Sequence, residues 1–260
     1  MTWSERRKLA YGGGLFIVVA SILGIILFQL TKVTPTCFDS KKNGDEVGVD
    51  CGGGCLQYCA NELAQPKVRW VRSFEISPGV VHVIAYIEHS YPGAAARKAT
   101  YQFKLYDAKN SLITERSGST MIGPMGRSAI VETLVQTGNS TVAVPRFSFT
   151  EPVPWEKVDP TFSQVSIKTD RTFLEQFDGG TRLTATLENK NRFSFADMEV
   201  VAILYDNRDN AVTASKTLVS NLPAIGSQTI YFTWPQKIDP KTIRRIEVIP
   251  RVNPFNAVAL

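Results

Sequence analysis

The sequence predicts an all-β protein in which two tandem β-sandwiches follow one N-terminal transmembrane helix and a small cysteine-rich segment. Three observations predict this architecture. Residues 10–30 are apolar and uncharged, all four cysteines fall between residues 37 and 59, and short β-type runs begin at residue 68. We therefore divide the chain into an N-terminus (1–8), a helix (9–31), a cysteine-rich segment (32–65) and two sandwiches (66–169 and 170–260).

The apolar run has the length of a membrane-spanning helix. About 21 residues at about 1.5 Å per residue span roughly 31 Å, which matches the hydrocarbon core of a bilayer. A cleaved signal peptide has a shorter apolar core, which ends at a site of small residues. Here the run continues into Leu30-Thr31-Lys32-Val33-Thr34-Pro35, so we expect an uncleaved anchor.

The charges beside this run predict its orientation. Arg6, Arg7 and Lys8 precede it, and positive flanking charges favour the cytoplasmic side. We therefore expect residues 1–8 in the cytoplasm and the rest, beyond the helix, on the extracytoplasmic side. The net charge of +5 includes no long Lys/Arg run, so no nucleic-acid partner is expected.

The cysteine-rich segment is too short and too rich in glycine to bury a core, and segments of this kind need cross-links. In an oxidising compartment an even number of cysteines favours disulfides. We expect two among Cys37, Cys51, Cys55 and Cys59, in any of three connectivities. A zinc site is the alternative, although the spacing lacks the C-x2-C pairs of common zinc ribbons.

A calcium loop is a further candidate in this segment. Carboxylate and amide side chains stand at the first, fifth, seventh and twelfth positions of a 12-residue stretch, namely Asp39, Asn43, Asp45 and Asp50. Gly44 stands at the sixth position, where calcium loops turn sharply, but Lys41 occupies the third, where a ligand is expected. The alternative is an Asx-rich turn whose carboxylates accept hydrogen bonds from backbone amides.

The segment also resembles a cysteine-rich motif of bacterial surface proteins, C-x-D…N-G-x-E-x-G-V-D-C-G-G-x-C…C. The match covers residues 37–59. This resemblance implies an extracytoplasmic module and assigns it no chemistry.

From Val68 onward, runs of β-branched and aromatic residues alternate with polar residues and are broken by Pro, Gly, Asn or Asp every 8 to 12 positions, about the spacing of strands in a sandwich. The tripeptide Leu105-Tyr106-Asp107 recurs as Leu204-Tyr205-Asp206, at an offset of 99 residues. This offset predicts a duplicated domain. Strand alternation places Phe103 and Leu105 toward the core and Lys104 and Tyr106 on the other face.

A second pair of motifs predicts an insertion in the first copy. Trp155 to Pro160 is similar to Trp234 to Pro240, where the offset between the Asp-Pro pairs is only 80 residues. We therefore expect about 19 inserted residues at about 128–146, and a closing strand at 164–168 that corresponds to 245–249. Insertions on a rigid sandwich often carry function, so we take Ile130, Leu134 and Asn139 as candidate partner-binding residues. The alternative is a hairpin that closes the sheet edge.

The string Phe103-Lys104-Leu105-Tyr106-Asp107 resembles the FxLYD family of bacterial immunoglobulin-like domains. The second copy departs from the pattern, with Ala202 in place of the phenylalanine. The resemblance implies two immunoglobulin-like β-sandwiches, an exported location and a binding or structural role without catalytic residues.

The residue content also favours a function without catalysis. The two histidines, His82 and His89, are an odd number of positions apart, and no nucleophile, metalloprotease or phosphate-loop motif occurs. We expect no catalytic residues and no cofactor, except calcium if the loop above binds it. The expected function is non-catalytic binding or structural work in the cell envelope, with another envelope protein or a surface polymer as partner. The alternative is a calcium-dependent envelope sensor or assembly factor.

Overall fold

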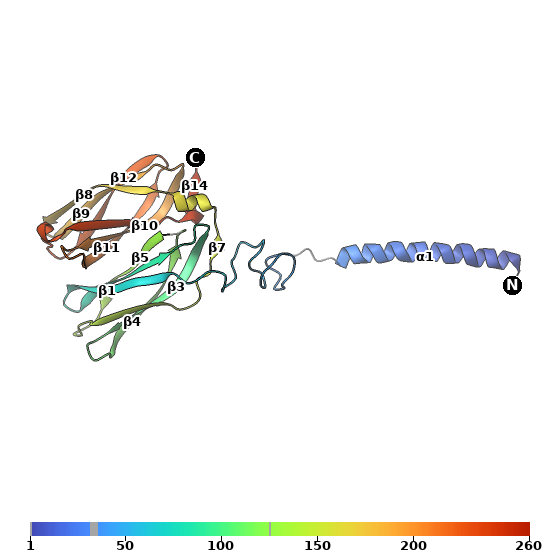
Figure 1. Ribbon diagram of the computed structural model, residues 1–260, viewed down its shortest axis with the longest axis horizontal. Coiled ribbons are helices and arrows are strands. Elements are labelled where there is room, and N and C mark those ends of the chain that lie inside the picture. The colour runs from blue at the N-terminus through green and yellow to red at the C-terminus, as the bar shows by residue number, and fades with distance from the viewer. Residues whose placement is uncertain (1, 32–35, 125) are drawn as a thin grey trace.

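The computed structural model describes residues 2–31, 36–124 and 126–260. The fold consists mostly of β-sheet, with one helix at the N-terminus, as Figure 1 shows. The helix is apolar, and the segment between it and the first strand contains two disulfides. Helix α1 (Trp3–Thr31) contains the window Tyr11–Phe28, which has a mean hydropathy of 2.3 and is not buried anywhere inside the molecule. By length and composition, α1 is therefore able to cross a membrane.

The first β unit consists of two antiparallel sheets. One has the order β1 (Lys67–Ser77), β2 (Val80–His89), β5 (Gly126–Gln136). The other has the order β4 (Leu112–Ile122), β3 (Ala94–Tyr106), β6 (Val144–Phe149), and β7 (Glu156–Lys157) pairs with the start of β3. Phe103 and Leu105 are buried in the core between the sheets, whereas Lys104 and Tyr106 are only half-buried, as alternation predicts.

The second unit repeats this arrangement. Its sheets have the orders β12 (Gly226–Trp234), β9 (Gly180–Asn189), β8 (Ile167–Phe177) and β11 (Ala211–Leu222), β10 (Phe193–Tyr205), β13 (Arg245–Pro250). Strand β14 (Ala257–Ala259) pairs with the start of β10. Three 3-10 turns, η1 (Pro160–Gln164), η2 (Pro240–Thr242) and η3 (Pro254–Asn256), follow Asp159, Asp239 and Asn253, whose side chains cap them.

The repeated tripeptide has the same local structure in both units. Asp107 accepts hydrogen bonds from the backbone amides of Lys109 and Ser111, and Asp206 accepts them from Arg208 and Asn210. Both carboxylates therefore stabilise the turn that follows β3 or β10, as expected for an Asp at the start of a turn.

The structure corrects the predicted insertion. Residues 126–136 form β5, which pairs with β2 just as β12 pairs with β9, so residues 128–146 are not an addition to the first copy. The predicted closing strand at 164–168 is also wrong, because β6 pairs with β3 as β13 pairs with β10. The Asp-Pro strings that misled the alignment encode capped 3-10 turns, which precede different strands in the two units. The predicted boundary at 169/170 falls inside β8.

The two units pack against each other through a third apolar cluster. The outer face of β2 and β5 contributes Ile84, Tyr86, Ala129 and Val131. The outer face of the second unit's β10 sheet contributes Val201, Ile203, Tyr205, Ala211, Ala214 and Ile249. The result is a stack of four sheets, in which the two middle sheets are covered on both faces; Figure 1 shows β5 beside β10.

A buried arginine adds polar contacts to this interface. Arg251, whose side chain is 6% exposed, follows β13 and forms an ion pair with Glu199 of its own unit. Its guanidinium also donates hydrogen bonds to the Thr120 hydroxyl, the Met121 carbonyl and the Ser128 hydroxyl, all in the first unit. One side chain therefore connects β4 and β5 of the first unit to β10 of the second.

The cysteine-rich segment contains the two expected disulfides, Cys37–Cys55 and Cys51–Cys59, so the zinc alternative is excluded. The segment also contacts the first unit. The Tyr58 amide donates to the Trp155 carbonyl (2.9 Å), and the Lys157 amide donates to the Leu56 carbonyl (2.7 Å). These bonds extend the sheet at β7 and fix the segment to the first unit.

Candidate functional site: the interunit groove

A groove of about 720 Å³ opens where the two units meet, and we call it the interunit groove. It is lined by four arginines, three aromatic residues, three carboxylates and an alanine: Arg69, Arg72, Arg127, Arg245, Trp70, Tyr86, Tyr205, Glu88, Asp209, Glu247 and Ala211. Both units contribute to this lining, so the groove depends on the way they pack.

The first unit supplies one wall from the outer face of its β1-β2-β5 sheet. Trp70 on β1 lies opposite Tyr86 on β2, and their rings stack with centroids 5.1 Å apart. One row further along, Glu88 on β2 lies opposite Arg127 on β5. The Arg69 guanidinium donates to Glu88 (2.6 Å). Tyr86 and Glu88 share a face because they are two residues apart on one strand, whereas Arg69 and Trp70 are adjacent and both reach the groove where the register of β1 shifts.

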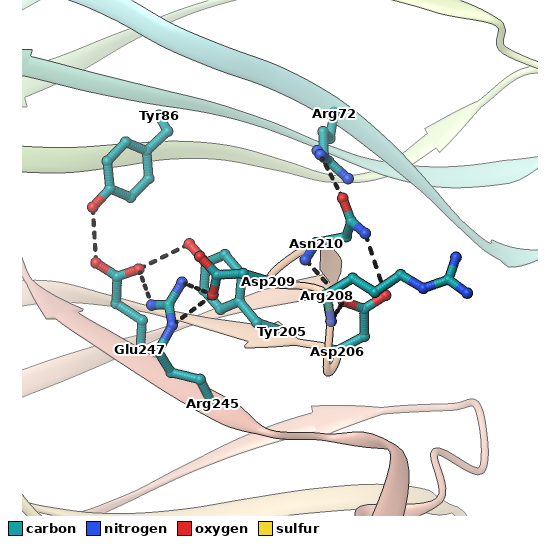
Figure 2. A network of polar contacts seen from close by, with 9 residues as sticks. All are labelled: Arg72, Tyr86, Tyr205, Asp206, Arg208, Asp209, Asn210, Arg245 and Glu247. Atoms are coloured by element: carbon teal, nitrogen blue, oxygen red, sulfur yellow. Dashed lines mark hydrogen bonds and ion pairs between the residues drawn. The ribbon is translucent and has the colours of Figure 1, made fainter.

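The second unit supplies the other wall, in which Glu247 on β13 is the central acceptor (Figure 2). The phenol of Tyr86 donates to one oxygen of Glu247, and the phenol of Tyr205 donates to the other, both at 2.8 Å. Arg245 donates to the same carboxylate at 3.1 Å. Since Tyr86 belongs to the first unit, this carboxylate connects both walls.

The turn after β10 completes the site. Asp206 caps this turn, and Asp209 occupies the left-handed region, with φ of 59°. The turn directs the Asp209 carboxylate toward Arg245, which donates to it at 2.8 Å and lies 3.6 Å above the Tyr205 ring. Figure 2 shows the neighbouring Asn210 side chain directed at Arg72 of the first unit.

The pKa values of the two phenols in the groove, Tyr86 and Tyr205, are both raised. Burial, followed by the hydrogen bond to Glu247, raises the pKa of Tyr86 to about 12, and the same causes raise the pKa of Tyr205. Both phenols therefore stay protonated at neutral pH and act as hydrogen-bond donors. The arrangement holds a fixed pattern of donors and acceptors beside an aromatic surface.

The candidate calcium residues lie in the disulfide-bonded segment, away from this groove. Asp50 accepts the amides of Asp39 and Ser40, while Asp39 accepts the Lys41 amide and the Asn43 side-chain amide. That hydrogen bond from Asn43 is the main cause that lowers the pKa of Asp39. Asp45 is exposed. These contacts are those of the Asx-rich turn, and calcium binding stays a prediction.

The candidate partner-binding residues of β5 and its following loop do not form one surface. Ile130 is 1% exposed and packs in the core of the first unit, so its assignment to a contact surface is wrong. Leu134 is exposed at a bulge of β5. Asn139 lines a different groove, of about 450 Å³, near Pro78. Ile130 and Leu134 are four positions apart, so alternation alone would place them on one face, and the bulge between Glu132 and Val135 separates them.

The residues of the interunit groove were not predicted from the sequence, although the sequence does indicate which sheets of the two units meet. Val83 to Ile87 and Val200 to Tyr205 are unbroken apolar runs, whereas their counterparts in the other unit alternate with Thr or with Gln and Lys. Unbroken runs are typical of strands that are covered on both faces. The sheets that contain β2 and β10 are indeed the two that meet.

Comparison of the sequence with models of known protein families gives no match, and comparison with curated proteins gives no match either.

Proposed function

We propose that this chain is a single-pass membrane protein of a bacterial cell envelope. Helix α1 anchors it, residues 1–8 lie in the cytoplasm, and the cysteine-rich segment and two immunoglobulin-like β-sandwiches lie outside. There the protein works as a non-catalytic binding or structural protein, which contacts another envelope protein or a surface polymer. The FxLYD-like strings at 103–107 and 204–206 support the immunoglobulin-like assignment and the bacterial origin.

The observation that carries this proposal is the exposed apolar helix next to disulfides. The side chains that the structure describes between Tyr11 and Phe28 are exposed, and most are large and apolar. Transfer of such a surface from water into lipid is strongly favourable, at about 25 cal/mol per Å². The disulfides that follow favour an oxidising compartment beyond the membrane.

The groove supports a binding role. Its carboxylates already have partners, its phenols stay protonated, and the two units hold its walls in a fixed relation. Arginine, tyrosine and tryptophan dominate the lining, and these residue types carry much of the energy of protein interfaces. Such a surface is suited to recognition of a partner.

A topology assay tests the proposal. Alkaline phosphatase, which is active only outside the cytoplasm, and green fluorescent protein, which fluoresces inside it, are fused separately after Leu260 in a bacterial host. We expect active phosphatase and no fluorescence. Reversal of Arg6, Arg7 and Lys8 to Glu lowers the phosphatase signal. The control Lys41→Glu/Lys42→Glu removes positive charge from the side expected to be extracytoplasmic, so it does not lower the signal. A fluorescent fusion with inactive phosphatase contradicts the proposal.

A further inference from the structure

Two arginines of the interunit groove have no carboxylate partner. Glu88 pairs with Arg69, and Asp209 and Glu247 both pair with Arg245. Among the residues that the structure describes, Arg72 and Arg127 take part in no ion pair. The guanidinium of Arg72 makes only long contacts, at 3.4 Å to the Ala211 carbonyl and 3.5 Å to the Asn210 side chain. Among the described residues neither guanidinium is neutralised by a carboxylate, so both can pair with an anion.

These two arginines lie beside the aromatic pair. Arg72 lies 5.9 Å from the centre of the Trp70 ring, and Arg127 is close enough to affect the pKa of the Tyr86 phenol. Trp70 is half-buried, and the ring of Tyr86 supports it from β2. A ligand in the groove therefore meets an apolar surface between two positive groups.

The remaining charges distinguish among anions. A polymer with a negative charge on every unit meets repulsion from Glu88, Asp209 and Glu247, which line the same groove. A peptide carries its carboxylates at intervals and has amides that can donate to these acceptors. Its apolar side chains also have a surface to contact at Trp70. The volume of about 720 Å³ lies within the range of about 300–1,000 Å³ that is usual for ligand sites.

We propose that the interunit groove binds an extended acidic peptide segment of a partner protein. Carboxylates of the segment pair with Arg72 and Arg127, in the bidentate geometry that guanidinium groups favour, and an apolar side chain of the segment packs on Trp70. This inference rests on the proposed binding function and names the chemistry of the partner.

The test uses the full-length protein in detergent micelles and, as probe, a fluorescein-labelled hexapeptide in which glutamate and valine alternate, with fluorescence anisotropy as readout. We expect saturable binding, which weakens as salt rises, and none to the same peptide with lysine in place of glutamate. The double variant Arg72→Gln/Arg127→Gln binds the probe about tenfold more weakly, because charge-assisted hydrogen bonds are lost. The matched control Arg116→Gln/Arg192→Gln removes two exposed charges outside the groove and changes the affinity less than about twofold.

The single variant Arg127→Gln controls for the possibility that the double variant disrupts the packing of the two units. Arg127 is exposed, so its substitution should leave that packing intact. It should retain the wild-type unfolding curve and still weaken binding severalfold. Absence of saturable binding, or equal weakening in both double variants, overturns the inference. Tighter binding of polyphosphate than of the glutamate–valine peptide, dependent on Arg72 and Arg127, also overturns it in favour of a phosphate polymer. The assay does not depend on membrane orientation, so its failure leaves the topology result intact.

Discussion

At the scale of single residues, the contact between the units depends on a few polar side chains. Arg251 and Glu247 each bond to both units, and His82 of the first unit bonds through its ring to the Ala214 carbonyl of the second (3.2 Å). Buried groups of this kind stabilise a structure only while every partner is present and in the right protonation state.

Arg251→Ala should destabilise the protein by about 3–5 kcal/mol, the usual effect of breaking a buried ion pair. Glu199 would keep only Lys216 as a charged partner, and the Met121 carbonyl would lose its arginine donor. Urea unfolding measures this change. The control Arg116→Ala removes an exposed arginine and should change the free energy of unfolding by less than about 0.5 kcal/mol. Equal effects of the two substitutions would contradict the role assigned to Arg251.

Stability should also fall in mild acid because of the two histidines. Burial lowers the pKa of both His82 and His89 from the ordinary value of 6.5. A lowered pKa means that the unfolded chain binds protons more readily, so this stability is complete above pH 6.5 and is lost as pH falls through the folded pKa. Urea midpoints measured from pH 7.5 down to about pH 5 should decrease. A constant midpoint over that range would refute the buried, neutral state of these rings.

At the scale of elements, the sequence predicted which residues of a strand face the core, but not which sheet covers the outer face of that strand. The positions of Phe103 and Leu105 followed from the pattern of β3, and Ile130 was assigned wrongly because an insertion was expected where β5 lies. That error arose from Asp-Pro turns, whose local chemistry does not specify the strand that follows. The disulfides were expected, but their connectivity depends on how the short segment that contains all four cysteines folds, which the spacing does not specify.

The interunit groove could not be predicted for a related reason. Its arginines and tyrosines come from β1, β2, β5, β10 and β13, and no single one of these strands indicates which residues of the other unit it meets. Only the packing of β2 against β10 brings Tyr86 to Glu247. The unbroken apolar runs in these two strands were the signal for that packing.

The duplication supplies a matched pair of substitutions for this idea. Ile203 on β10 and Lys104 on β3 occupy equivalent positions on the outer faces of their sheets. Ile203 is buried against the first unit, whereas Lys104 is half-buried on an outer face that no other sheet covers. Ile203→Lys should destabilise the protein by more than about 3 kcal/mol, because it places an unpaired charge in an apolar interface. Lys104→Ile should change it by less than about 0.5 kcal/mol. Calorimetry of both variants would measure the difference, and similar effects would argue against the interface.

At the scale of the whole molecule, the two units form a stack with polar ends. The uncovered outer face of the first unit carries Gln102 and Lys104, and that of the second unit carries Thr184 and Thr186. The faces through which the two units contact each other carry Ile, Val and Tyr instead. Polar terminal faces stop a stack of repeats from growing. Backbone hydrogen bonds from Leu56 and Tyr58 attach the cysteine-rich segment to the first unit, which supplies one wall of the interunit groove.

The central claim is that the two units are one rigid body, and a distance measurement between them tests it most directly. All four native cysteines are in disulfides, so spin labels at Ser117→Cys on β4 and Thr229→Cys on β12 are specific. These exposed positions lie on the two outermost sheets, whose planes are three sheet spacings apart, so the labels are separated by at least about 30 Å. Electron–electron double resonance should give one narrow distance distribution, broadened only by the labels. A broad distribution, or several separate distances, would show that the units move independently and that the interunit groove is not a fixed site.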